Sequence, residues 1–387
     1  MPSGARGRPI QVAVLGVSLS PNCGVRDHAL VLAGELESAG ISCSVHWLLR
    51  SERSLRGSRR EVAAWVGELA GELSRARPDV ILLHYSVFTL SHRGVPLFVP
   101  SLLAALRRSG APIVTVMHEF AYPWELGGWR GKVWAVTQRA MLIELLRVSS
   151  ATIVTAGSRK RWLQARPWLP RREVAVAPVF SNLPPPLSSS RAPHDVPLVG
   201  LFGYSYQGAA VSLVLDAVEE LCDRAAPVHL ILLGAPGPSS PAGEEWLSEA
   251  RARGLADVVS FTGPLSAQAL SDSLAACDVL LFADVSGPTS RKGTLAGSLG
   301  SGRPVVAIDG PLTWRELAEA RAVALAAPNA RGLAHVLAEL LGDAAELQAL
   351  GARGRSFYER EMEVGRTVQC ARRLIDEAAS SRGRGRR

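Results

Sequence analysis

A glycine-rich stretch with two adjacent cations, residues 287–307, has the residue types that suit an anion-binding site. It follows an apolar run at residues 277–283, which is typical of a buried parallel strand. Turn-forming residues open the stretch, Arg291 and Lys292 follow, and small residues then predict a helix. The first N–H groups of a helix lack intrahelical partners, and its dipole favours negative charge there. We interpret the stretch as a site for the phosphate groups of a ligand. The alternative is an ordinary strand-to-helix connection that is basic.

Polar side chains also follow three strand-like segments in the first half of the chain. They lie in the loop at residues 22–28, at His84, and at the pair His118 and Glu119. In a parallel sheet such positions share the carboxyl edge, where ligands bind. We therefore expect a second functional site there. The alternative for His118 is a histidine that caps a strand and takes no part in chemistry.

Apolar strand-like runs alternate with amphipathic helical segments along the chain, which predicts an α/β fold with right-handed parallel sheets. The first series of strands is expected at residues 10–16, 42–48, 79–84, 111–119, 151–155 and 174–179. The second series is expected at residues 197–203, 228–234, 258–263, 277–283, 304–308 and 322–326. The basic segment at residues 50–60 is interpreted as a mobile loop.

The length of the chain predicts two domains. Its 387 residues, 47% of them apolar, are too many for one core and sufficient for two. A Pro- and Ser-rich run at residues 181–190 is typical of a linker. We expect a first domain over residues 1–183, a linker over 184–195, a second domain over 196–358, a last helix over 359–379 and a disordered basic tail over 380–387.

The composition indicates a cytoplasmic protein. No apolar run approaches the roughly 18 residues that a membrane span needs, and residues 1–9 lack the apolar region and cleavage motif of a signal peptide. The five cysteines are far apart and form no metal-like pair. This spacing favours a reducing compartment and argues against a disulfide framework or a zinc site.

Charge is distributed unevenly between the two halves of the chain. Residues 1–190 hold 23 Lys and Arg against 12 Asp and Glu, whereas the remainder is slightly acidic. A basic first half suits an anionic membrane surface or a phosphorylated acceptor; the alternative is a solvated basic surface. No aromatic-interleaved basic patch supports nucleic acid as a partner. We expect the tryptophans at 124, 129 and 134 to pack against the domain, with a membrane-facing or acceptor-facing segment as the alternative.

Taken in order, several motifs resemble those of the GT-B glycosyltransferases, specifically the large retaining group often called family four. Residues 230–235, 258–266, 274–282 and 302–307 are similar to successive segments of that group's donor domain. Residues 21–29 and 114–119 resemble its acceptor-side glycine loop and its strand-end histidine motif, and residues 181–184 resemble the run into its linker. The resemblance covers nearly the whole chain.

The resemblance implies two Rossmann-like domains that face each other across a cleft, a nucleotide-sugar in that cleft, and a C-terminal helix that crosses back to the first domain. It implies no cofactor and no metal, because protein groups stabilise the leaving diphosphate. Retention in this group is usually ascribed to front-side attack, so no enzymic nucleophile is expected. The catalytic residues implied are His118, Glu119 and Asp27. The donor-binding residues implied are Gly203, Tyr204, Gln207, Gly234, Thr262, Gly263, Thr289, Ser290, Arg291, Lys292, Gly293 and Thr294. The acceptor-binding residues implied are Asn22, Gly24, Arg26 and His84.

The chain departs from the family pattern at three places. The family usually carries two glutamates separated by seven residues, and the matching positions here are Thr289 and Gly297. The family usually has a basic pair after the first strand of the second domain. This pair is missing here, and Tyr204 and Gln207 lie near its positions in the sequence. A subset of the family has a similar Ser-Arg-basic-Gly loop with a small residue in place of the second glutamate.

The function implied is transfer of a sugar from a nucleoside-diphosphate sugar to a hydroxyl acceptor, which is a glycan, a lipid-linked glycan or a secondary metabolite. One alternative is a catalytically silent protein that binds a nucleotide-sugar or partners an active transferase. Another is a sugar-phosphate epimerase of related architecture, which would need a carboxylate-rich cleft. If the basic half meets a membrane, contact is expected at its inner face. The sequence leaves open the donor base, the sugar, the acceptor and the oligomeric state.

Overall fold

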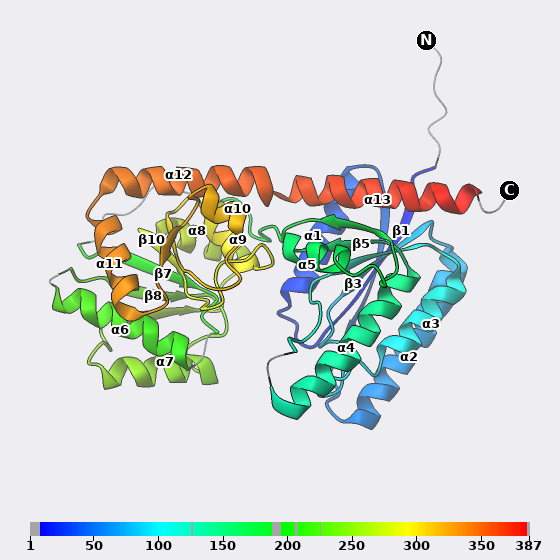
Figure 1. Cartoon of the computed structure of the whole chain (residues 1–387), viewed down its shortest axis with the longest axis horizontal. Coiled ribbons are helices and arrows are strands. Elements are labelled where there is room, and N and C mark those ends of the chain that lie inside the picture. Colours follow the sequence, from blue (N-terminus) through cyan, green and yellow to red (C-terminus); the bar gives the residue numbers. More distant parts are fainter. Residues whose placement is uncertain (1–7, 125–126, 188–194, 206–207, 225, 385–387) are drawn as a thin grey trace, which may run out of the picture. The chain divides into compact units, whose positions relative to one another are not determined.

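The computed structural model describes residues 8–124, 127–187, 195–205, 208–224 and 226–384 (Figure 1). The chain divides into two compact units. Unit 1 contains residues 1–178 together with residues 364–387, and unit 2 contains residues 179–363. In the described part of the chain, no helix combines the length and apolarity that crossing a membrane requires.

Unit 1 is built on a six-stranded parallel sheet with the order β2-β1-β3-β4-β5-β6. Its strands are β1 (Gln11–Ser18), β2 (Ser42–Leu49), β3 (Val80–Tyr85), β4 (Ile113–Met117), β5 (Ser149–Val154) and β6 (Glu173–Val176). Strands β3 and β4 are buried along their whole length, as expected where helices cover both faces of a parallel sheet.

The helices of unit 1, within its described residues, are α1 (Gly24–Ser38), α2 (Leu55–Ala76), α3 (Val99–Ser109), α4 (Gly128–Val148), α5 (Gly157–Gln164) and α13 (Val364–Arg384). Residues of α2, α3 and α4 share one apolar core with alternate residues of β1 and β3, such as Leu15 and Leu83. The last helix, α13, packs against α1 and against β3, β4 and β5 (Figure 1). The chain therefore returns to its first unit at its C-terminal end.

Unit 2 holds a second six-stranded parallel sheet, with the order β12-β11-β10-β7-β8-β9. Its strands are β7 (Leu198–Phe202), β8 (His229–Leu233), β9 (Val259–Gly263), β10 (Val279–Phe282), β11 (Val305–Ile308) and β12 (Ala324–Ala326). Its described helices are α6 (Ala209–Asp223), α7 (Pro241–Ala252), α8 (Ala267–Ala276), α9 (Gly293–Gly300), α10 (Arg315–Glu319), α11 (Ala330–Leu341) and α12 (Ala344–Glu361). This strand order is that of the dinucleotide-binding Rossmann fold.

All twelve predicted strands are present, which confirms the α/β fold class. The unit boundaries differ from the expected ones. Unit 2 begins at Val179, and the described part of the expected linker is bonded to α8: Ser271 Oγ donates to Pro184 O and Asp272 accepts from Leu187 N. Residues 188–194 lie outside the described residues.

Two further expectations about basic segments differ from the structure. The helix expected over 359–379 is α13, which continues to Arg384 into the tail expected to be disordered, because Arg382 donates to Pro78 O. The mobile loop expected over 50–60 is instead half helix, since Ser54 caps α2 by accepting from Gly57 N, and the buried Arg50 donates to Thr89 O.

Candidate functional site

The sheet of unit 2 has a topological switch point between its neighbouring strands β7 and β10. Strands β8 and β9 extend the sheet on one side, and β11 and β12 extend it on the other. Ligands of open parallel sheets bind beyond the carboxyl ends of the strands at such a point. The turn after β7 starts at Gly203, and the segment after β10 leads to Lys292 and into α9. The phosphate stretch predicted from the sequence therefore lies at the switch point.

The loop after β10 is held in place by the segment that follows β11. Leu312 N donates to Ser286 O and Trp314 N donates to Pro288 O, both at 2.8 Å. Gly287 has φ +93°, and a Cβ atom there would lie 2.3 Å from Thr313 Oγ1. Only glycine tolerates both the positive φ and the close approach of Thr313 at this position. Together with the two hydrogen bonds, this fixes the backbone of the loop.

The two cations of this loop differ in their surroundings. Lys292 Nζ lies 2.9 Å from Asp284 Oδ2, whereas Arg291 is exposed and has no ion-pair partner among the described residues. Burial acts to raise the pKa of Asp284, but hydrogen bonds from Ser286 and Lys292 outweigh it and hold the pKa below its ordinary value. Asp284 is thus a carboxylate at neutral pH, and it orients Lys292.

The N-terminus of α9 supplies further donors. Lys292 is its N-cap in extended conformation with no side-chain cap, so the first N–H groups of the helix remain available. Gly203, at φ +74°, approaches this end so closely that a Cβ atom would lie 2.6 Å from Thr294 Cγ2. The Thr289 hydroxyl is buried without a hydrogen-bond partner in the described part of the chain. The backbone amides and the two cations together can bind a diphosphate.

The two positions where the family carries glutamate are both buried here. A Cβ atom on Gly297 would lie 3.0 Å from Phe202 Cε1 and 3.4 Å from Leu183 Cδ1. Thr289 is only 6% exposed, as is typical of a core position. The space that a glutamate at 297 would need is therefore occupied by apolar side chains.

The remaining donor-binding predictions have varied surroundings. The side chain of Tyr204 is fully buried, its hydroxyl accepts from Gly237 N, and its ring packs edge-on against Phe261, so this side chain belongs to the core rather than to a ligand site. Gly234 N donates to Thr262 Oγ1 at 2.9 Å, which ties the ends of β8 and β9 together. Gln207 lies outside the described residues.

Three further donor-binding predictions are Ser290 on the phosphate loop, Gly293 at the start of α9 and Gly263 at the end of β9. Ser290 is buried, and its carbonyl accepts from Val179 N at 2.8 Å. Gly293 is exposed and opens α9, and Gly263, at φ +68°, ends β9. These three positions shape the backbone around the loop.

In unit 1 the predicted polar groups also converge on a switch point, between β1 and β3. His84 lies on β3, His118 follows β4, and His28 comes from the first turns of α1. His84 Nδ1 is 3.0 Å from His118 Nε2, and these two rings are stacked with 5.3 Å between centroids. The ring of His28 stands edge-on to both, at 4.9 Å from His118 and 5.7 Å from His84.

Burial keeps all three imidazoles neutral at pH 7. It lowers the pKa of His28 to about 4, and it holds the pKa values of His84 and His118 well below the usual range, with additional repulsion from the neighbouring histidines. One nitrogen from each ring lies within 4.8 Å of the other two. Because neutral imidazoles are common metal ligands, His28, His84 and His118 could together hold a metal ion.

The carboxylates expected to be catalytic lie near this cluster in sequence but differ in contacts. Glu119 accepts a 2.7 Å hydrogen bond from Ser86 Oγ, which ties it to the segment after β3. Asp27 is exposed in the first turn of α1; partial burial raises its pKa, and the neighbouring Arg26 acts against this. A raised carboxyl pKa improves a general base.

The acceptor-side loop places its residues at the start of α1. Asn22 and Gly24 are exposed, and Arg26 is half-buried. A Cβ atom on Gly24 would meet no other atom within 4 Å. The loop is thus an open edge beside the histidine cluster.

Two residues of these sites, Asp284 and Arg159, were not predicted from the sequence, and His28 was predicted only as part of the loop at residues 22–28. Asp284 lies two residues after β10, so its position at a strand end was the available signal. Arg159 on α5 donates from Nη1 to Met117 O and to His118 O, both at 3.0 Å, and fixes the end of β4. No local pattern distinguishes this arginine from its basic neighbours in the sequence.

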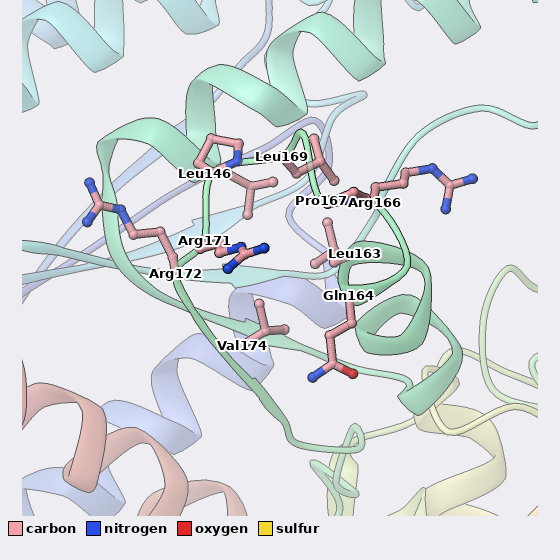
Figure 2. A pocket seen from close by; sticks show the side chains of 10 residues that line it. Leu146, Leu163, Gln164, Arg166, Pro167, Leu169, Arg171, Arg172 and Val174 are labelled. Atoms are coloured by element: carbon pink, nitrogen blue, oxygen red, sulfur yellow. The ribbon is translucent and has the colours of Figure 1, made fainter.

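A pocket of about 270 Å³ lies elsewhere in unit 1, between α4, α5 and the start of β6. Its floor is apolar, with Leu146, Leu163 and Leu169, and arginines stand around it (Figure 2). Figure 2 shows Arg166 and Arg172 extending in opposite directions. Because β6 begins at this edge, the pocket is at the opposite end of the sheet from the histidine cluster.

The comparisons with known proteins agree with this geometry. Residues 195–343 match the family model described as glycosyl transferases group 1. No curated protein matches the chain in sequence. Sucrose-phosphate synthase from Thermosynechococcus elongatus is 15% identical with a TM-score of 0.73, over 96% of this chain and 100% of that one. HepE of Anabaena, crystallised with UDP, is 16% identical with a TM-score of 0.66, over 95% and 100%.

A third solved structure limits what the fold alone can indicate. A protein described as a putative UDP-N-acetylglucosamine 2-epimerase, from Listeria monocytogenes, is 15% identical with a TM-score of 0.62, over 95% of this chain and 97% of that one. Transferases and this epimerase share the two-unit fold, so the fold does not separate them. The family match over unit 2 does, and it supports a transferase enzyme.

Proposed function

Since residues 195–343 match the family model of group 1 glycosyl transferases and the chain has the GT-B fold, we propose that the protein transfers a sugar from a nucleoside-diphosphate sugar to a hydroxyl acceptor. The observation that carries the proposal is the loop after β10. It brings Arg291, Lys292 and the free amides of α9 to the switch point of a Rossmann-type sheet. HepE, of the same fold, was crystallised with UDP and with UDP-glucose.

The chemistry of the donor explains why these groups are needed. When the bond between the anomeric carbon and phosphate breaks, negative charge develops on the leaving diphosphate, and preorganised donors stabilise it. Lys292, oriented by Asp284, and the α9 amides supply such donors within one loop. We propose on this basis that transfer needs no divalent metal. From the resemblance to the retaining group, we also propose that it proceeds with retention by front-side attack.

Unit 1 is proposed to bind the acceptor. Asp27 is exposed beside the glycine loop and has a raised pKa, so it suits the task of orienting or deprotonating a hydroxyl. Glu119 is bonded to Ser86 and is better suited to shaping the site. The acceptor is a glycan, a lipid-linked glycan or a secondary metabolite.

The start of α4 supports peripheral contact with the inner face of an anionic membrane. The tryptophans had been expected to pack against the domain. Trp134 does so, but Trp129 is 73% exposed and Trp124 is 50% exposed. Arg130 and Lys132 adjoin Trp129, and the guanidinium of Arg130 lies 5.5 Å from its ring centroid. Exposed tryptophans with adjacent cations suit a lipid interface.

A thermal-shift screen with UDP, GDP, dTDP, ADP and their sugars tests the proposal. A ligand that binds only the folded protein raises its melting temperature. We expect one nucleotide to stabilise the wild type but not the Arg291→Ala, Lys292→Ala double variant, and we expect slow hydrolysis of the corresponding sugar donor. Chelation by EDTA should leave that hydrolysis unchanged.

The alternative function, a catalytically silent protein that binds a nucleotide-sugar or partners an active transferase, is favoured by one observation. Thr289 and Gly297, where the family carries glutamates, are both buried. Nucleotide binding without turnover of any sugar donor would favour this alternative. Absence of a shift with every nucleotide would refute the phosphate-loop assignment itself.

A further inference from the structure

We propose that His84 is a positioning residue, which holds His118 in the tautomer whose proton is on Nδ1, so that His118 acts as a hydrogen-bond donor rather than as a base. The contact that carries this is the 3.0 Å distance between His84 Nδ1 and His118 Nε2. A neutral imidazole has one N–H and one lone pair. One of the two rings therefore donates this hydrogen bond, and the other accepts it.

The surroundings of His84 decide which ring is the donor. Its other nitrogen, Nε2, is buried and has no hydrogen-bond partner among the described residues. If His118 donated, the proton of His84 would sit on that Nε2 as a buried, orphaned N–H group. If His84 donates from Nδ1, its Nε2 carries only a lone pair. Orphaned buried N–H groups are rarer than unsatisfied acceptors, so His84 is the donor.

The state of His118 follows from this assignment. Its Nε2 accepts the proton of His84, and the ring is neutral because it is buried among two other imidazoles. Its single proton is therefore on Nδ1. The main chain on either side is fixed, because His118 N donates to Tyr85 O and Arg159 donates to His118 O.

This tautomer defines the role that His118 can take. As a whole residue His118 is half-buried, whereas His28 and His84 are buried, so we place the reactants on the His118 side of the cluster. An N–H group suits a sugar hydroxyl or a developing oxyanion, and it cannot remove a proton. This second step rests on the proposed function. The tautomer itself does not.

A metal ion and this hydrogen bond exclude each other. Binding of a metal by the three rings requires a lone pair on one nitrogen of each. The contact between His84 Nδ1 and His118 Nε2 instead places a proton between one nitrogen of each of these two rings, so neither of these two nitrogens can bind a metal ion while the hydrogen bond persists. Zinc titration is therefore a direct test.

The experiment uses the full chain labelled with ¹⁵N-histidine and long-range ¹H–¹⁵N correlation at pH 7, which reads the protonated nitrogen of each ring. Loss of signals in His118→Gln and His84→Asn assigns the two rings. We expect the His118 proton on Nδ1 and no change on adding one equivalent of Zn²⁺. In His84→Asn the amide N–H takes the place of Nδ1–H, so the tautomer should persist. In His84→Leu, of similar size but without a donor, the proton should move to Nε2.

Activity provides the second readout. The ratio kcat/KM should fall by about tenfold in His84→Leu and by less than about threefold in His84→Asn, because the two variants differ by one hydrogen bond to His118. A His118 proton on Nε2 in the wild type, identical spectra for His84→Leu and wild type, or zinc shifts in all three rings would each overturn the proposal. If the spectra agree but no sugar donor is turned over, the proposed function fails and the tautomer assignment stands.

Discussion

Restoring the family glutamate at position 297 should damage the protein rather than improve it. Gly297 is buried in α9, and its Cβ position lies 3.0 Å from a ring carbon of Phe202 and 3.4 Å from a methyl of Leu183. Gly297→Ala gains about 1 kcal/mol of helix propensity but loses about 1–3 kcal/mol to overpacking. The alanine variant should therefore be neutral or destabilised by up to about 2 kcal/mol.

Gly297→Glu adds a carboxylate among apolar groups. The charge is desolvated without a partner, or Phe202 is displaced, and either outcome costs several kcal/mol. We expect a loss of about 3–5 kcal/mol in the free energy of unfolding of unit 2. For a unit of this size that loss lowers the melting temperature by roughly 6–20 °C.

The assay is thermal unfolding of the full chain with and without the nucleotide that stabilises it. The transition that shifts with nucleotide belongs to unit 2, so the two units are distinguished. Gly71→Ala is the matched control, because Gly71 is exposed within α2 and an added Cβ would meet nothing within 4 Å; it should gain about 1 kcal/mol. The reasoning is refuted if Gly297→Glu melts with the wild type and binds nucleotide more tightly.

Three further predictions follow from the same structure. Below pH 6.5 the unfolded chain protonates His28, whereas unit 1 does not until about pH 4, so His28 should lower the free energy of unfolding by about 1.4 kcal/mol per pH unit, about 3.4 kcal/mol in all. His84 and His118, whose pKa values are also lowered, should add to this slope in the same direction. Urea titrations that show no slope, or a slope in His28→Leu equal to that of the wild type, would contradict this. Asp284→Asn breaks the ion pair with Lys292 and removes a negative charge near the proposed diphosphate site. Calorimetry should therefore show nucleotide binding about fivefold tighter, a gain of roughly 1 kcal/mol in binding free energy. Weaker binding would mean that the orientation of Lys292 by Asp284 matters more than the charge. The double variant Trp129→Ala, Arg130→Ala should bind anionic vesicles more weakly than the wild type, and binding of the wild type should weaken as the salt concentration rises. Vesicle binding that changes neither with the substitutions nor with salt would count against membrane contact at these residues.

The strands could be predicted from the sequence because each is a short apolar run at the spacing of an α/β chain. Helix α12 was missed for a physical reason. It contains Gly351 and Gly354, which lower helix propensity, yet a Cβ at Gly351 would lie 2.5 Å from Gly302 O. These glycines are therefore required by close packing, which outweighs local propensity.

The candidate site was predictable where one segment of chain carries it and less so where several meet. The phosphate loop is continuous, so Arg291 and Lys292 were found from their neighbours. The histidine cluster depends on the strand order β2-β1-β3-β4, which brings His28 at the start of α1 close to His84 and His118 at the ends of β3 and β4. The spacing of residues along the sequence does not reveal the order of the strands in the sheet.

The charge of the donor loop offers a reason why threonine is acceptable at position 289. The loop retains one carboxylate, Asp284, and this one is already neutralised by Lys292 at 2.9 Å. With Thr289 in place of a glutamate, Arg291 remains uncompensated, and the loop has a net positive charge to offer a diphosphate. A glutamate at 289 would cancel that charge while adding a contact to the sugar. Under the proposed function, the loop would therefore bind the donor through its diphosphate at the expense of the sugar contact, and selection among sugars would depend on groups outside the loop.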